Sequence, residues 1–295
     1  MTPFVTVVVP TFNRPAALRA CLEALARQDH PADAFEVVVV DDGSAATHAE
    51  ANRAIADAHR VRLLRQANRG PASARNHGVT VAQGEYIAFT DDDCMPTPGW
   101  LSHLADAPTL TSARGGRTLN TLTSDLHADA TQLLIDYLYD YYRERDGAFF
   151  TSNNLLMSRR QLLELGGFDE TMRHAGAEDR ELCGRWLQRG WRLDFVADAV
   201  VHHAHALTLA DFWRQHFTYG RGARAYHVRR AHWAARPVQL EPLRFYRDLL
   251  RYPWSRARGW RTSALLLVSQ IANASGYFYA RAAGDAAPRL EPDAQ

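Results

Sequence analysis

Apolar runs alternate with amphipathic stretches over the first ninety residues, and this alternation restricts the fold more than any other feature. The apolar runs are residues 5–10, 35–40, 61–64 and 85–90. Helical periodicity occupies the intervals, at about 15–27, 48–59 and 72–82. Strands that alternate with helices form a parallel sheet with right-handed crossovers. The sequence therefore predicts an α/β protein.

Acidic clusters directly follow two of these predicted strands. Asp41 and Asp42 come after the second strand, and Asp91, Asp92 and Asp93 come after the fourth. Unpaired carboxylates lose solvation when they are buried, so something positive should lie beside them. Ligands of open α/β sheets bind at the carboxyl ends of the strands, and Asp oxygens suit Mg²⁺ or Mn²⁺ carrying a phosphate. A metal–diphosphate site is expected at this edge of the sheet.

Composition sets only broad limits on this protein. The chain has 295 residues, and its 46% hydrophobic content is enough for a substantial core. Three widely spaced cysteines argue against a disulfide framework or a zinc knuckle. The first residues lack a basic region followed by an apolar segment, so no secretory signal is expected. We expect a cytoplasmic protein, at most held at the inner face of the membrane.

Beyond residue 97 the periodic pattern is looser. Gly115 and Gly116 predict a turn, and residues 133–142 predict an aromatic-rich helix. Further strands are predicted over 149–158, 191–196 and 199–202, and further helices over 160–165 and 178–188, the last stopped by Gly190. A tight turn is expected at 166–169, and a loose polar tail at 283–295.

The C-terminal third has a distinct composition. Residues 221–261 hold eleven Arg against Glu241 and Asp248, and the Arg residues alternate with aromatic ones. This mixture suits a membrane interface, single-stranded nucleic acid, or solvated helices packed on the catalytic domain. Residues 262–280 are uncharged and long enough to span a bilayer, but their polar side chains argue against spanning. We expect a packed or interfacial helix, peripheral membrane contact through 221–280, and no nucleic-acid partner.

Six motifs, in order, resemble those of the family 2 glycosyltransferases. They are VVVPTFNR at 7–14, VVDDGS at 39–44, ARNHG at 74–78, the aspartates at 91–93, GGFDE at 166–170, and Glu178-Asp179. The resemblance covers about residues 4–222. It implies a GT-A fold, which is Rossmann-like with a mixed, mainly parallel sheet flanked by helices. It divides the chain into a catalytic domain at 1–222, a helical extension at 223–282 and a tail, with nucleotide-binding and acceptor halves meeting near residue 96.

The resemblance implies a metal-dependent, inverting enzyme that uses Mn²⁺ or Mg²⁺. It would move a sugar from a nucleotide diphosphate-sugar, with a UDP-sugar weakly favoured, to a hydroxyl of a saccharide, lipid-linked or other acceptor. Residues 97–148 and the C-terminal third are expected to select that acceptor.

The resemblance also assigns residues to the nucleotide. The loop after the first strand would line the base, through main-chain groups and Asn13, and its expected contacts are Pro10, Thr11, Asn13 and Arg14. Asp42, together with Asp41, would accept a hydrogen bond from the base, and Arg75 would face the base or diphosphate. The structural alternatives are a strand-ending turn for the loop, a helix N-cap for Asp42 and a surface salt bridge for Arg75.

A further set of residues would hold the ribose and the metal. By the family's Asp-x-Asp pattern, Asp91 would contact the ribose and Asp93 the metal, while the role of Asp92 stays open. Residues two apart point the same way in extended chain, which supports this division. Of the histidines after the last strand, His203 is the expected metal or diphosphate ligand, with His205 as alternate and His202 not excluded. An acidic solvated loop and a surface or core histidine are the structural alternatives.

The pair Glu178-Asp179 resembles the family's acidic pair, in which the second residue is the catalytic base. Such a base takes the proton from the acceptor hydroxyl as it attacks the anomeric carbon. The metal would neutralise charge on the departing diphosphate. Both acids could instead simply complement the dipole of a helix N-terminus.

Two other functions would also need a diphosphate site. A sugar nucleotidyltransferase would be expected to show a Gly-rich phosphate loop after the first strand, and residues 10–15 contain no glycine. An inactive nucleotide-sugar or carbohydrate-binding module would lack a base, whereas Glu178-Asp179 is present.

Overall fold

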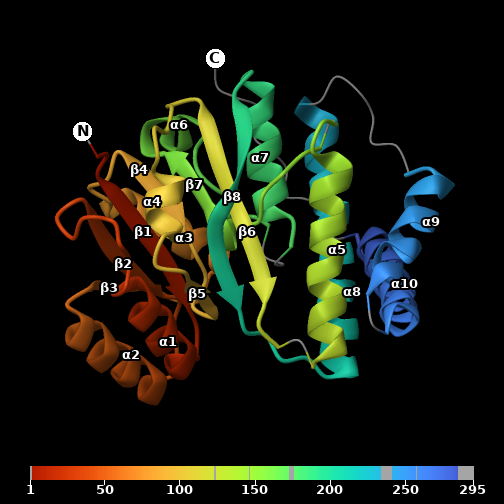
Figure 1. Cartoon of the computed structure of the whole chain (residues 1–295), viewed down its shortest axis with the longest axis horizontal. Coiled ribbons are helices and arrows are strands. Elements are labelled where there is room, and N and C mark those ends of the chain that lie inside the picture. The colour runs from red at the N-terminus through yellow and green to blue at the C-terminus, as the bar shows by residue number, and fades with distance from the viewer. Residues whose placement is uncertain are drawn as a thin grey trace.

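The structure, a computed structural model, describes residues 2–122, 124–145, 147–172, 176–233, 241–256 and 258–284. Its centre is an eight-stranded mixed sheet with the strand order β3-β2-β1-β4-β7-β6-β8-β5 (Figure 1). Of the tail predicted at 283–295, residues 285–295 lie outside the described residues. The α/β prediction is confirmed.

The first half of the chain forms the parallel part of the sheet. Its strands are β1 (Val5–Thr11), β2 (Phe35–Asp41), β3 (Arg62–Arg65) and β4 (Tyr86–Phe89), and its helices are α1 (Pro15–Leu25), α2 (Ala46–His59) and α3 (Pro71–Val81). Valines of β1 and β2 alternate between two cores, because successive strand side chains face opposite sides. One core includes side chains of α1, α2 and α4 (Trp100–Leu104), and the other those of α3, α6 (Arg159–Glu164) and α7 (Glu178–Gln188).

The second half adds antiparallel strands that bring distant residues to the sheet edge. Strand β7 (Leu155–Ser158) runs antiparallel to β4, and β6 (Ser112–Asn120) lies between β7 and the long strand β8 (Arg192–His203). A short strand, β5 (Cys94–Pro96), pairs with the end of β8 so that Cys94 lies opposite His203. This pairing places the aspartate cluster beside the histidines.

Several predictions for this half are wrong in detail. Gly115 and Gly116 do not form a turn but lie inside β6, because neighbours leave no room for a side chain. A Cβ atom would lie 2.1 Å from the Phe150 ring at Gly115 and 2.1 Å from the Ala199 carbonyl oxygen at Gly116. The predicted strand 149–158 is reduced to β7, preceded by a 3₁₀ turn, η1 (Ser152–Asn154), and the two strands predicted after Trp191 are one strand, β8. Strand β5 and helix α4 were not predicted.

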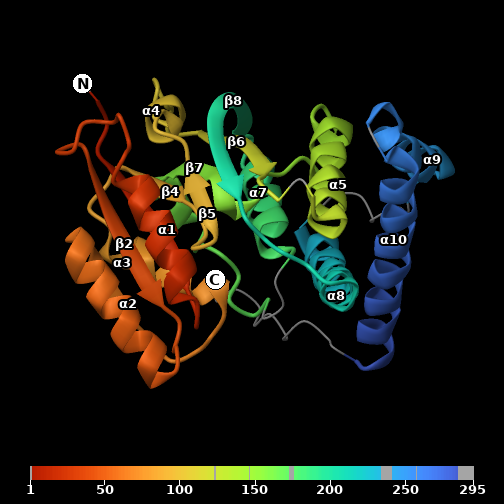
Figure 2. The same ribbon diagram turned by 60° about the horizontal axis from the view of Figure 1, so that its bottom comes forward.

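Five helical segments complete the described chain beside the sheet (Figures 1 and 2). They are α5 (Leu126–Tyr142), α8 (Leu209–Trp233), α9 (Leu243–Arg251), η2 (Tyr252–Ser255) and α10 (Gly259–Ala282). Helix α8 runs through residue 222, so no break in the helix marks the predicted domain boundary. Among the described residues, no helix combines the length and apolar character that crossing a bilayer requires.

Helices α8 and α10 approach closely through two glycines. A Cβ atom on Gly220 of α8 would lie 1.9 Å from the Asn273 carbonyl oxygen, and one on Gly276 of α10 would lie 1.9 Å from the Phe217 carbonyl oxygen. The same helix also buries Leu266, which packs in a cluster with side chains of α5 and α9. The expectation that residues 262–280 pack on the protein is therefore confirmed for the residues in these contacts.

We predict that Gly220→Ala destabilises the fold, because the added methyl group would force the two backbones apart. Overpacking of this kind costs about 1–3 kcal/mol. Gly222→Ala is the matched control: it lies on the same helix, its nearest neighbour would be 3.4 Å away, and Ala favours a helix over Gly by up to about 1 kcal/mol. Urea unfolding should show a loss of stability for the first variant alone; equal unfolding midpoints would contradict the close packing.

Candidate active site

A cleft of about 470 Å³ opens at the carboxyl ends of β1, β2 and β4. Its walls come from both halves of the chain and include α3, α5, α7 and α8. The predicted site residues that line it are Pro10, Thr11, Arg14, Asp42, Arg75, Asp91, Glu178, Asp179 and His203. The structure thus gathers most of the predicted residues around one cavity.

The three consecutive aspartates occupy different environments. Asp91 is partly open and accepts a hydrogen bond of 2.7 Å from Arg75. Asp92 is fully buried, accepts a hydrogen bond of 2.7 Å from Thr11 and pairs with Arg14 at 2.7 Å. Burial outweighs both partners and raises the pKa of Asp92 to about 7. Asp92 therefore supports the position of Arg14 and Thr11 and does not line the cleft.

Asp93 lies beside two histidines and Arg14. Its oxygens are 3.4 Å from Nε2 of His203 and 3.6 Å from Nδ1 of His205, and the imidazole rings stack with centroids 5.5 Å apart. Burial would raise the pKa of Asp93, but hydrogen bonds with both histidines and the charge of Arg14 hold it well below its usual value. His202 precedes His203 in β8 and so points to the opposite face of the sheet.

These groups form a donor set that fits a divalent cation. A carboxylate with two imidazoles suits Mn²⁺ better than Mg²⁺, which prefers oxygen ligands. Cys94 lies close to Asp93 and His203, but its thiol is fully buried, and burial raises its pKa well above the usual value. Thiolates favour softer ions than Mn²⁺ or Mg²⁺, so Asp93, His203 and His205 are the candidate set for these two cations.

Arg75 connects the aspartate cluster at the end of β4 to the acidic pair at the start of α7. Its guanidinium is 2.7 Å from Asp91 and 3.3 Å from Glu178, and it lies over the Phe168 ring at 5.5 Å. The side chain is only 4% exposed, so the alternative of a surface salt bridge is wrong. The second carboxylate oxygen of Glu178 accepts hydrogen bonds from the backbone N–H groups of Gly176 and Ala177. Glu178 is thus committed to holding Arg75 and the start of α7.

Asp179 is the acidic residue of the cleft best suited to accept a proton. It accepts backbone hydrogen bonds from Arg180 at 2.7 Å and Ser152 at 3.3 Å. Burial, and then the neighbouring charge of Glu178, raises the pKa of Asp179 to about 7. A carboxylate with this pKa is matched to general base catalysis near neutral pH.

Three predicted nucleotide contacts organise loops. Asp41 points away from the cleft and accepts hydrogen bonds from Ser44 N–H and the Asn52 amide. Asn13 has a left-handed backbone with φ 56°, and its side-chain oxygen accepts a hydrogen bond from Ala45 N–H just before α2. Asp42 does line the cleft, and its oxygens hold the backbone N–H groups of Arg69 and Gly70. Asp42 does not cap α2, whose cap has no side-chain hydrogen bond.

Sequence reasoning missed the residues that close the cleft on the other side. They are polar or aromatic side chains from β6, α5, η1 and α8: Thr118, Thr131, Gln132, Asn153, Gln215 and Tyr219. They come together only when α5 and α8 dock on the sheet, so no local pattern marks most of them. Tyr219 is the exception: it lies in the FTYGRG segment at 217–222, which favours His203 as the expected ligand but does not by itself assign Tyr219 to the cleft.

The fold places an acidic cleft at the carboxyl edge of an α/β sheet. The family model described as "Glycosyl transferase family 2" matches residues 6–109, and "Glycosyl transferase family group 2" matches residues 110–278. The chain belongs to glycosyltransferase family 2, whose members are enzymes that transfer glycosyl groups.

Individual relatives point the same way. The chain is 31% identical to the pre-mycofactocin glycosyltransferase of Mycobacterium tuberculosis over 238 residues, or 76% of this chain and 48% of the relative. It is 24% identical to chondroitin synthase of Escherichia coli over 238 residues, or 67% of this chain and 34% of the relative. The chain thus spans about half or less of the length of these curated relatives.

Solved structures support the GT-A fold. A mannosyltransferase from Pyrobaculum calidifontis, in complex with GDP-Man and Mn²⁺, superposes with a TM-score of 0.62 at 22% identity. The superposition covers 98% of this chain and 82% of the mannosyltransferase chain. GalNAc-T7 with UDP, GalNAc and Mn²⁺ has a TM-score of 0.56 at 16% identity, covering 84% of this chain and 55% of its own.

We predict that Arg75→Met strongly destabilises the protein, because it leaves Asp91 and Glu178 without their shared cation. Breaking a buried ion pair in this way costs about 3–5 kcal/mol. Arg189→Met is the matched control, since Arg189 pairs with Glu164 at 2.7 Å but both side chains are about half exposed. Such a surface pair is worth less than about 1 kcal/mol. Denaturant unfolding that gave equal losses for the two variants would contradict the structural role of Arg75.

Proposed function

We propose that this protein moves a sugar from a nucleotide diphosphate-sugar to an acceptor hydroxyl, with inversion at the anomeric carbon. The observation that carries the proposal is one cleft lined by Asp179 and by the Asp91 and His203 side chains of the cation-binding edge. A single displacement needs a base and a held leaving group, and no carboxylate nucleophile. A nucleotidyltransferase is not favoured by the family match, and an inactive module would not need a buried base.

On the donor side, Asp42, Arg75 and Asp91 would bind the nucleoside, and Arg14 would face the diphosphate. Asp93, His203 and His205 would hold Mn²⁺, with Mg²⁺ a weaker fit to two imidazoles. When bound, the cation supplies charge neutralisation for the departing diphosphate. A UDP-sugar is the first donor to test, because the family resemblance weakly favours it. Thermal shifts with nucleoside diphosphates and Mn²⁺ report donor binding through mass action.

On the acceptor side, Asp179 would take the proton of the attacking hydroxyl. Glu178 is less suited to this work, because it is paired with the Arg75 guanidinium and also holds the start of α7. The negative charge of Glu178 instead helps to keep the pKa of Asp179 raised. In this proposal the pair divides into one base and one residue that positions it. The acceptor would be a saccharide or another hydroxyl-bearing molecule, a lipid-linked one included.

We predict that Asp179→Asn lowers kcat about 10²–10⁴-fold, because the amide cannot accept the proton. Since the base must be ionised, kcat/KM of the wild type should rise with pH through about 7, the pKa of Asp179. The residual activity of the variant should lack this rise. Rates of metal-dependent turnover over a panel of nucleotide-sugars, measured across pH, provide the test.

Asp93→Ala gives the complementary result for that prediction. This variant should lose the Mn²⁺-dependent thermal shift with nucleoside diphosphate, whereas Asp179→Asn should keep it. No turnover of any donor by the wild type, or full activity of Asp179→Asn, would overturn the proposed mechanism.

We also propose that α10 contacts a membrane surface peripherally. Its outward face carries Trp260, Leu267, Ile271 and Phe278, each at least 50% exposed and spaced by whole helical turns. Arg261 lies over Trp260 at 5.2 Å, and Arg251 lies over Trp254 at 5.8 Å, next to the start of α10. An apolar stripe flanked by Arg and Trp fits an anionic lipid interface.

Sedimentation with anionic and neutral vesicles tests this contact. Ile271→Ser should weaken binding to anionic vesicles about tenfold, because inserting such a side chain contributes about 1.5–3 kcal/mol. Leu243→Ser is the control, since Leu243 is 87% exposed but belongs to α9 and not to the stripe on α10. Wild-type protein that ignores anionic vesicles would rule the contact out.

A further inference from the structure

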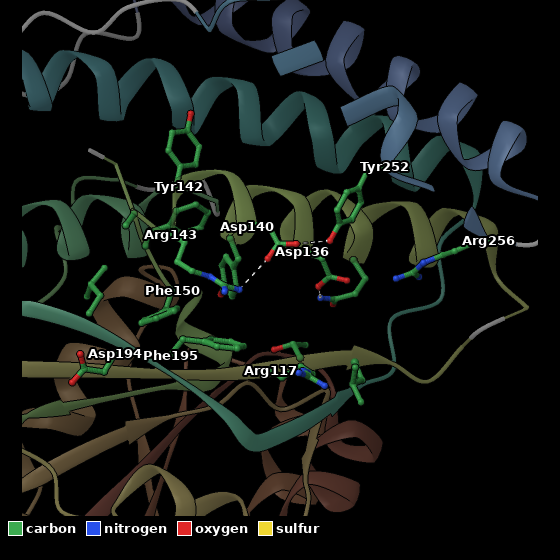
Figure 3. Close-up of a pocket in the computed structure, with 17 residues that line it drawn as sticks. Arg117, Asp136, Asp140, Tyr142, Arg143, Phe150, Asp194, Phe195, Tyr252 and Arg256 are labelled. Carbon is green, nitrogen blue, oxygen red and sulfur yellow. Dashed lines mark hydrogen bonds and ion pairs between the residues drawn. The ribbon is translucent and has the colours of Figure 1, made fainter. Parts of the chain in front are cut away.

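A second cavity, of about 640 Å³, lies between α5 and strands β6 and β8 (Figure 3). It shares Thr118 and Gln132 with the catalytic cleft, so the two cavities are neighbours across these side chains. At its far end it shares Asp140 and Tyr252 with a third cavity of about 390 Å³. The three cavities therefore follow one another along α5. We call the second cavity the α5 groove.

A polar stripe on α5 runs along this path. Gln132, Asp136 and Asp140 are spaced by four residues, so they lie on one face of the helix. At the helical rise per residue they extend over about 12 Å, longer than one sugar ring. Gln132 donates a hydrogen bond of 2.9 Å to Asp136, and Asp140 accepts one of 2.8 Å from Tyr252. The stripe is therefore held in place before any ligand arrives.

The opposite wall is aromatic. Phe150 and Phe195 stack with ring centroids 6.3 Å apart. Phe150 is buried, whereas Phe195 is 40% exposed and carries Arg143 over its ring at 5.9 Å. Figure 3 shows Asp136, Asp140 and Arg143 extending from α5 toward the strands that carry Phe195 and Arg117. Aromatic faces pack well against the apolar C–H faces of sugars, while carboxylates and guanidinium groups bind their hydroxyls.

The charges of the groove are balanced. Three arginines (Arg117, Arg143, Arg256) face three aspartates (Asp136, Asp140, Asp194) in its lining. Balanced charge gives no net attraction for an anion or a cation, so it favours a neutral ligand with many hydroxyl groups.

We propose that the α5 groove binds a neutral oligosaccharide acceptor, holding the sugar units that lie beyond the hydroxyl presented to Asp179. This inference rests on the proposed function, because it assigns an acceptor class to the same site. It makes the enzyme selective for chain length: an acceptor that reaches past Gln132 gains contacts with Asp136 and Phe195 that a monosaccharide cannot make.

Calorimetric titration with ladders of neutral oligosaccharides, from monosaccharide upward, tests this assignment. The full-length protein is used with Mn²⁺ and UDP present. We expect affinity to rise with chain length and then level off. Phe195→Ala and Asp136→Asn should each weaken binding of the longer ligands about tenfold, by removing one stacking face or one charged acceptor.

Glu144→Gln is the matched control for loss of a carboxylate. Glu144 is exposed, follows α5 directly and lines none of the three cavities. Its variant should bind the ladders as the wild type does. Asp136 is half-buried, so thermal melts of both Phe195→Ala and Asp136→Asn show whether each variant stays folded.

Three results would overturn the inference: affinity independent of chain length, unchanged affinity in both groove variants, or binding only to peptide or lipid-linked probes and to no ladder. Hydrolysis of the nucleotide-sugar donor separates this failure from a wider one. Donor hydrolysis without oligosaccharide binding removes only the groove assignment. Absence of donor hydrolysis, with no transfer, removes the proposed function itself.

Discussion

The site depends on one buried side chain, the positively charged guanidinium of Arg75. Arg75 holds Asp91, at the end of β4, and Glu178, at the start of α7, with a single planar guanidinium. Those two acids lie nearly ninety residues apart in the chain, and each would be costly to bury alone. Arg75 therefore joins the parallel half of the sheet, which carries Asp91, to the part of the chain that carries Asp179. Without Arg75, neither acid would have the charged partner that stabilises it at the cleft in this geometry.

A second constraint comes from sheet pairing. Strand β5 is only three residues long, but its antiparallel register with β8 places Cys94 opposite His203. Asp93 then lies within 3.4 Å of His203 and 3.6 Å of His205. The candidate cation site is thus built by the backbone hydrogen bonds of a short strand, which explains why so small an element is needed.

The sequence predicts what local patterns encode. The buried valine runs, Pro15 at a helix start and the aspartates after β2 and β4 all reflect local geometry, and they lead to the parallel sheet and its acidic edge. Prediction from the sequence fails where the role of a residue depends on neighbours that are distant in the chain. Gly115 and Gly116 resemble a turn, yet they accommodate Phe150 and the Ala199 carbonyl oxygen. Gln132 and Tyr219 carry no periodic signal, because α5 and α8 bring them to the cleft only after docking.

Identical side chains acquire different roles here through burial and neighbours. The pKa of Asp93 is held well below its usual value, so it stays ionised, while the pKa of Asp179 is raised to about 7. Folding therefore favours the protonated form of Asp179. Its contribution to stability is fully present below the ordinary Asp pKa of about 4 and is lost as pH rises through about 7. The same burial that raises the pKa of Asp179 thus lowers the stability of the fold at pH values where this carboxyl group is ionised.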